Sequence, residues 1–99
     1  MTATPGEGDR SELAFGPAAG RALAGRLPER VAAAVWAFCD GPLRDNPYRV
    51  GKALRAPLAG RYSARRGAYR VRYRVDDDKQ LVTVIDIAYR ADAYHPGRA

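Results

Sequence analysis

The chain has 99 residues, 46% of them hydrophobic, with a formal net charge of +6 and one cysteine. This length allows one small domain with a single core, and a lone cysteine excludes an internal disulfide and a cysteine-based metal site. No apolar run approaches the roughly 18–20 residues of a membrane-spanning helix, and the N-terminus lacks a signal-peptide pattern. We therefore expect a cytoplasmic protein without a membrane partner.

The positive charge is concentrated in one third of the chain. Residues 41–75 hold ten cationic side chains and one acid, whereas residues 1–40 carry a net charge of −1 and residues 76–99 one of −2. A concentrated positive field attracts a polyanion. Over the whole chain, 15 of the 17 cationic residues are arginines, which recognise phosphates with two parallel hydrogen bonds.

The first 40 residues predict a leader, a short strand and two helices. Residues 1–11 have no periodicity and are expected to be a flexible leader, followed by a strand over 12–15. Pro17 favours a helix start, and this helix is predicted to run to about Gly25. A second helix begins near Pro28, because apolar residues recur every three or four positions after it, and Gly41-Pro42 is expected to end it. Trp36 lies off this stripe and is expected to pack on the first helix, with partner binding as the alternative.

The remaining residues predict a loop and a sheet. Residues 42–58 contain three prolines and a glycine and are expected to form a loop. Strands are predicted at 60–63, 69–75 and 81–88, with turns at 64–68 and 76–80. The last strand is apolar except at Thr83 and Asp86, which is typical of a central strand covered on both faces. We predict one domain over residues 12–95 and a short tail over 96–99.

The strand at 69–75 alternates strictly between apolar or aromatic residues and arginines. Since side chains alternate between the two faces of a strand, this pattern predicts a sheet with one face on a core and a positive opposite face. If Val75 lies opposite Leu81 across the turn, Arg70 lies opposite Asp86, which would then orient its guanidinium group. A one-residue bulge would break this pairing.

The residue types favour RNA chemistry over other kinds of site. The single histidine, His95, stands near the C-terminus without a cluster of metal ligands, and no glycine-rich phosphate loop follows a strand, so we predict no metal ion and no cofactor. Arginines hold phosphates, and tyrosine rings stack on unpaired bases. RNA also carries its own nucleophile, the 2′-hydroxyl. A protein that aligns the backbone and stabilises charge on the phosphate needs no metal ion to cleave it.

Several segments resemble the RelE-type toxins of the RelE/ParE superfamily, which belong to bacterial type II toxin–antitoxin systems. The resemblance covers roughly residues 12–95, and its most specific part runs from Ala64 to Tyr73. Further similar segments are Phe15-Gly16-Pro17-Ala18-Ala19, Leu27-Pro28-Glu29, Gly41-Pro42-Leu43, Leu58-Ala59-Gly60 and Ile87-Ala88-Tyr89-Arg90. The resemblance implies an α+β fold in which two N-terminal helices pack on a small twisted antiparallel β-sheet.

The resemblance also implies an endoribonuclease that cuts mRNA in the ribosomal A site. By position, Arg70 is similar to the arginine that stabilises the scissile phosphate, Arg90 to one that supports the leaving group, and Tyr94 to the tyrosine that stacks on a base or transfers a proton. The predicted RNA-binding side chains are those of Arg61, Arg65, Arg66 and Arg72. The implied partners are a RelB-like antitoxin, of acidic character, and mRNA on the ribosome, with DNA contacted only through the antitoxin.

Two departures from the family pattern keep alternatives open. Arg61 and Ser63 stand where the best-studied branch has lysines, and arginine is a poor general base, so the base is Tyr94 with a lowered pKa, another group, or one supplied by the ribosome. The spacing from Arg90 to Tyr94 is also shorter, so Arg90 corresponds to either of two family arginines. The competing functions are a ParE-like inhibitor of DNA gyrase with the same fold and a catalytically degenerate module that binds RNA or antitoxin.

Overall fold

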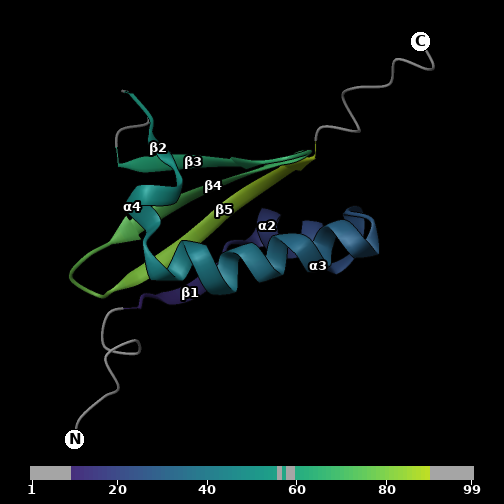
Figure 1. The fold of residues 1–99 in the computed structure, drawn as a ribbon, viewed down its shortest axis with the longest axis horizontal. Helices are drawn as coiled ribbons and strands as arrows, with labels where there is room; N and C mark the ends of the chain where they lie inside the picture. The colour runs from purple at the N-terminus through teal and green to yellow at the C-terminus, as the bar shows by residue number, and fades with distance from the viewer. Residues whose placement is uncertain (1–9, 56, 58–59, 90–99) are drawn as a thin grey trace, which may run out of the picture.

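The computed structural model describes residues 10–55, 57 and 60–89, which form an α+β domain. The elements in chain order are β1 (Glu12–Phe15), α2 (Pro17–Arg21), η1 (Ala22–Arg26), α3 (Glu29–Phe38), η2 (Cys39–Leu43), α4 (Pro47–Val50), β2 (Lys52–Ala53), β3 (Arg61–Arg66), β4 (Tyr69–Asp76) and β5 (Leu81–Tyr89). The predicted α+β class is confirmed, with the two N-terminal helical segments ahead of the main strands (Figure 1).

The sheet has five strands in the order β1-β5-β4-β3-β2. The four strands from β5 to β2 are antiparallel neighbours, as predicted, while the short strand β1 joins β5 in parallel and makes the sheet mixed. Figure 1 shows β2 and β3 at one side of the sheet and β1 at the other, with α3 lying near β1. Strand β5 lies inside the sheet, between β1 and β4. Only its residues Val82 and Val84 are buried, so the prediction that both of its faces are covered is wrong.

The first predicted helix is confirmed as α2 and its continuation η1, and the second begins at Glu29, directly after Pro28, near which its start was predicted. The expected end at Gly41-Pro42 is wrong, because the chain remains helical through η2 with Pro42 inside. Residues 39–43 have π-helical winding. This wider turn accommodates a proline ring and its missing N–H group, which would disrupt a regular α-helix.

The predicted loop at 42–58 contains regular structure. The side-chain oxygen of Asn46 accepts a hydrogen bond from the backbone N–H of Arg49 at 3.2 Å and caps α4. Strand β2 follows and pairs with β3. Strand β3 extends to Arg66, beyond the predicted end at 63, because the turn to β4 needs only two residues and Gly67 adopts a left-handed conformation with φ of 55°.

The core lies between the helices and one face of the sheet. Strand β4 contributes Val71 and Tyr73, both fully buried, and Val82 and Val84 of β5 lie beside them. The hydroxyl of Tyr73 donates a hydrogen bond to the backbone carbonyl of Pro47, which ties β4 to α4. The remaining buried apolar residues are Ala19, Ala22, Leu27, Val35, Phe38, Cys39, Leu43 and Ala64.

Trp36 contacts β1, which the sequence did not predict. Its ring lies 5.7 Å from the ring of Phe15 in β1, and the residue is 49% exposed. The reason is that β1 enters the sheet beside β5, which brings Phe15 under α3. The lone cysteine, Cys39, is fully buried, and burial raises the pKa of its thiol to about 12. No helix in the described ranges is long and apolar enough to cross a membrane.

Candidate nucleic-acid interface

Five arginines from two neighbouring strands project from the face of the sheet opposite the core. Strand β4 alternates between core residues and exposed arginines, as the sequence predicted, and β3 has the same alternation in register with it. We call this surface the arginine face, and its members are Arg61, Arg65, Arg70, Arg72 and Arg74.

The strand register sets these arginines directly opposite one another. Arg61 pairs with Arg74, and Arg65 pairs with Arg70, while Ser63 pairs with Arg72 between them. Residues directly opposite in an antiparallel pair have Cβ atoms about 5 Å apart, and like charges at that separation destabilise the sheet. Phosphates bound between the guanidinium groups would relieve this repulsion, so the register favours an anionic ligand.

The middle row holds an ion pair. Asp86 of β5 lies opposite Arg72 and accepts hydrogen bonds from its Nε and Nη2 atoms, each at 2.8 Å. These hydrogen bonds are the main cause that raises the pKa of Arg72. Within the part of the chain that the structure describes, Arg72 is the member of the arginine face with a carboxylate partner.

The predicted pairing of Arg70 with Asp86 is therefore wrong, and Arg70 lies opposite Ala88. Two features shift the register. The turn is one residue shorter than assumed, because Asp76 rather than Val75 lies opposite Leu81. In addition, a bulge between Arg72 and Tyr73 leaves Ile85 without a partner, so the pairing moves by one more residue before it reaches Asp86.

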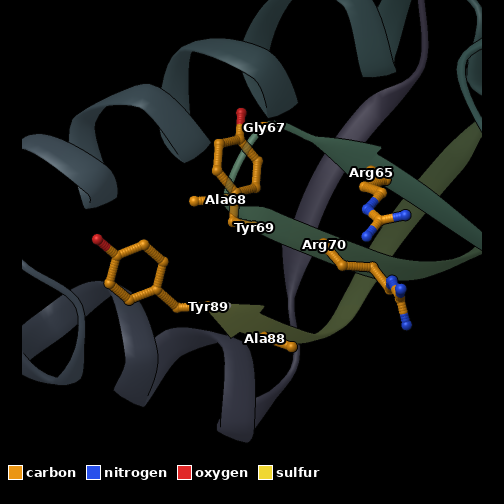
Figure 2. Close-up of a pocket in the computed structure, with 7 residues that line it drawn as sticks. All are labelled: Arg65, Gly67, Ala68, Tyr69, Arg70, Ala88 and Tyr89. Carbon is orange, nitrogen blue, oxygen red and sulfur yellow. The ribbon is translucent and has the colours of Figure 1, made fainter. Parts of the chain in front are cut away.

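An open pocket of about 220 Å³ lies where the β3–β4 turn meets the end of β5. Figure 2 shows the side chains of Arg65 and Arg70 together on one side of this end of the sheet, and the rings of Tyr69 and Tyr89 on the other. The other lining residues are Gly67, Ala68 and Ala88. Small residues between paired cations and two aromatic rings leave room for a phosphate and an adjacent base.

The tyrosine with a shifted pKa in this pocket is unsuited to accept a proton. Burial is the main cause that raises the pKa of Tyr69, so its hydroxyl stays protonated at neutral pH. That hydroxyl donates a long hydrogen bond of 3.4 Å to the carbonyl of Ala34 in α3. Tyr69 is therefore able to offer a ring edge or a proton to a ligand, but not a base.

The predicted site residues divide into three groups. Arg61, Arg65, Arg70 and Arg72 lie together on the arginine face, with Asp86 beside them. Arg66 lies elsewhere, since its guanidinium group packs over the ring of Phe38 at 4.6 Å, next to the helices. Arg90 and Tyr94 lie outside the described residues, although Arg90 directly follows Tyr89 of the pocket in sequence.

Arg74 was not among the predicted site residues, although the strand pattern had placed it on the positive face. The signal was present, because Arg74 continues the alternation of Arg70 and Arg72, but nothing in the sequence showed that it lies directly opposite Arg61. No group of three or more potential metal ligands occurs within residues 10–55, 57 and 60–89.

Comparison with known proteins identifies the family. A profile of the family described as "ParE toxin of type II toxin-antitoxin system, parDE" matches residues 10–94. Two toxins of Mycobacterium tuberculosis are similar in sequence. Toxin RelG is 51% identical over 69 residues, which cover 70% of this chain and 79% of RelG. Toxin RelE is 54% identical over 69 residues, which cover 70% of this chain and 71% of that toxin.

Solved structures agree with this assignment. A chain in the RelBE2 toxin–antitoxin complex of Mycobacterium tuberculosis is 44% identical and superimposes with a TM-score of 0.78, covering 82% of this chain and 99% of that one. Isolated RelE of Escherichia coli shares the fold at 22% identity, with a TM-score of 0.66 over 89% of this chain and 95% of that one. The chain therefore belongs to the RelE/ParE family of toxins from bacterial type II toxin–antitoxin systems.

Proposed function

We propose that this toxin is an endoribonuclease that cleaves mRNA on the ribosome and thereby arrests translation. The observation that carries this proposal is the directly opposed pair Arg65–Arg70 at the mouth of a pocket that also holds Tyr69 and Tyr89. Two guanidinium groups on one phosphate at one side of this end of the sheet, with two aromatic rings at the other side for an adjacent base, form a site suited to single-stranded RNA. Because the proposed substrate is mRNA on ribosomes, the toxin is proposed to act in the cytoplasm.

The proposed reaction uses the 2′-hydroxyl of the RNA as the nucleophile. The 2′-oxygen attacks the adjacent phosphorus while the bond from phosphorus to the 5′-oxygen breaks, which gives a 2′,3′-cyclic phosphate and a free 5′-hydroxyl. One proton leaves the 2′-hydroxyl and another reaches the departing 5′-oxygen. Arg65 and Arg70 supply positive charge where the phosphate gains negative charge, a contribution typically worth about 10²–10³ in rate for one donor.

The proton acceptor is proposed to be Tyr94 or a group of the ribosome. Arginines are protonated at any physiological pH, and the raised pKa of Tyr69 keeps it neutral. Arg90 follows Tyr89 in sequence and is proposed to support the leaving group. Arg61 is proposed to hold a neighbouring phosphate along the strands, and Arg72, because it is paired with Asp86, to make only a weaker phosphate contact.

The proposed regulator is an acidic, RelB-like antitoxin. Two solved relatives are complexes of a RelE toxin with its RelB partner, one from Mycobacterium tuberculosis and one from Escherichia coli. In this chain the net charge of residues 41–75 favours a partner with many carboxylates. An antitoxin segment that covers the arginine face would compete directly with RNA.

A second candidate function is inhibition of DNA gyrase, favoured by the description of the matching family as a ParE toxin. A gyrase inhibitor binds a protein and needs no paired arginines over a pocket. A degenerate toxin that binds RNA without cleaving it is the third candidate. Because all three candidates share the fold, they are separated by whether RNA is cleaved and by whether cleavage depends on the arginine pair.

The decisive experiment measures cleavage on ribosomes. Purified toxin is added to ribosomes that hold a defined mRNA, and new 5′ ends are mapped for the wild type, Arg70→Ala and Arg30→Ala. Arg30 is an exposed residue of α3, so its replacement removes the same charge away from the arginine face. We expect cuts within the A-site codon for the wild type and Arg30→Ala, and a loss of about 100-fold or more for Arg70→Ala.

Other outcomes point to the competing functions. Inhibition of gyrase supercoiling without new RNA ends would replace this proposal with the gyrase function. Saturable RNA binding without new RNA ends, for the wild type and for both variants, would identify a degenerate module. Cleavage that persists in Arg70→Ala would contradict the assigned role of the Arg65–Arg70 pair.

A further inference from the structure

The ion pair between Arg72 and Asp86 stands in the middle of the arginine face. On one side lies the row of Arg65 and Arg70, and on the other the row of Arg61 and Arg74. Each row is two residues further along the strands, which corresponds to about 6.8 Å per row. The central position therefore carries no net charge, while both flanking rows carry two positive charges each.

A β-bulge in the pairing of β4 with β5 places the carboxylate of Asp86 at this central position. Up to Tyr73 the partners follow the register set by the β4–β5 turn, with Tyr73 opposite Val84. The bulged residue Ile85 then lets Asp86 lie opposite Arg72, with both side chains on the open face. Bulges are specific features of a fold and often redirect a side chain near a functional site.

The same ion pair borders two hollows in this surface. One, of about 120 Å³, is lined by Leu54, Arg61 and Ile85 in addition to the pair. The other, of about 350 Å³, lies between the pair, the helical segment with Ala18 and Arg26, and the end of β5. A polynucleotide that extends from one hollow to the other passes over the carboxylate of Asp86.

We propose that Asp86 is a specificity-determining residue of the RNA-binding surface, which neutralises Arg72 and so restricts strong phosphate binding to the two flanking rows. The proposal rests on the proposed function in that the intended ligand is single-stranded RNA. With Asp86 in place, a polyanion gains full electrostatic attraction only at two separate rows. Without it, the surface becomes one continuous cationic track that binds any polyanion more strongly.

The test is a salt titration with a short single-stranded DNA oligonucleotide, which lacks the 2′-hydroxyl and cannot be cleaved by the proposed reaction. Asp86→Asn removes the charge and keeps the size of the side chain. We expect it to bind about three- to tenfold more tightly at low salt. We also expect the slope of log affinity against log salt to steepen by about 0.7, the value for one further phosphate contact on a single strand.

Three companion variants make the result specific. Glu29→Gln removes the same charge from the start of α3 and should leave the slope unchanged. Arg72→Gln leaves Asp86 unpaired on the face and should weaken binding. The double variant Arg72→Gln/Asp86→Asn should return close to the wild-type affinity and slope, because it removes a neutral pair.

Two results would overturn the proposal. If Asp86→Asn weakens binding as Arg72→Gln does, Asp86 acts by orienting Arg72 and not by neutralising it. If its slope equals that of the wild type, the ion pair serves only the stability of the sheet, which thermal unfolding of the same variants reports separately. Neither result bears on ribosome-dependent cleavage, which the Arg70→Ala experiment tests independently.

Discussion

The two faces of strand β4 carry opposite kinds of residue on the same eight positions. One face presents Val71 and Tyr73, fully buried against the helices, and the other presents the exposed side chains of Arg70, Arg72 and Arg74. Strand pairing sets both faces at once, because a shift by one residue would exchange them. This toxin thus uses a strand packed on the core to hold together charges that repel one another.

The largest expected effect separates the two faces by activity. Arg65→Ala, like Arg70→Ala, should reduce ribosome-dependent cleavage by about 100-fold or more while leaving the protein folded, since it removes a charge from the exposed row alone. Circular dichroism should match the wild type, and thermal stability should be equal or slightly higher, because the repulsion from Arg70 is removed. Loss of folded structure in this variant would contradict the separation of roles between the two faces.

A change on the buried face should act through stability. Tyr73→Phe removes the hydrogen bond to the carbonyl of Pro47 and leaves that buried acceptor without its partner. We expect a loss of about 1–3 kcal/mol in the free energy of unfolding, measured by urea denaturation. Cleavage activity per folded molecule should stay unchanged, and a selective loss of activity would show that the core face also serves catalysis.

Gly51 offers a second test of the buried face. A Cβ atom at this position would overlap the hydroxyl oxygen of Tyr73 and would lie 3.0 Å from the carbonyl oxygen of Ser63. Gly51→Ala should therefore destabilise the protein by about 1–3 kcal/mol. The double variant Gly51→Ala/Tyr73→Phe should lose less than the two single losses together, because the second change removes the clashing atom. Strict additivity would contradict this contact.

The pH dependence of stability should also report on the buried face. Burial raises the pKa of Tyr73 from 10.0 to about 12, so the folded state holds this proton more tightly than the unfolded chain. Its stabilising contribution is complete below pH 10 and is lost as the pH rises towards 12. Thermal unfolding should show a decline in this window that is smaller in Tyr73→Phe. An equal decline in both proteins would exclude Tyr73 as its source.

The smallest expected effect concerns the repulsion within the arginine face. Arg74→Gln removes one partner of the directly opposed Arg61–Arg74 pair, so it should raise stability by a few tenths of a kcal/mol, up to about 1 kcal/mol, at low salt. Added salt should reduce the gain, because it screens the repulsion in the wild type. A loss of stability at low salt would show that the two guanidinium groups do not repel each other in the folded protein.

Sequence periodicity predicted which residues share a face, but not which residues lie opposite each other. The alternation over 69–75 was enough to separate Tyr73 from Arg72. It contained no information on the length of the β4–β5 turn or on the bulge at Ile85, so Asp86 was assigned to the wrong arginine. Register depends on cross-strand contacts made by residues distant in sequence, which a local pattern does not encode.

Two further features of the helical region were not predicted, each for a reason of its own. Pro42 was read as a helix end because proline disrupts α-helical hydrogen bonding, whereas π-helical winding accommodates it. The contact of Trp36 with Phe15 was not predicted, because the parallel pairing of β1 with β5 depends on residues almost 70 positions apart. The family resemblance was enough to predict the fold. That Arg65 and Arg70 lie directly opposite each other could be seen only from the strand register.

The buried cysteine makes the protein convenient for spectroscopy. Cys39 is the single thiol of the chain and is fully buried, and burial raises its pKa to about 12, so the thiol stays protonated at neutral pH and thiol-reactive dyes should not label the folded protein. Ser63 lies on the arginine face, opposite Arg72. A Ser63→Cys variant would therefore accept one fluorophore at one known position, and its emission would report directly on whatever covers this face.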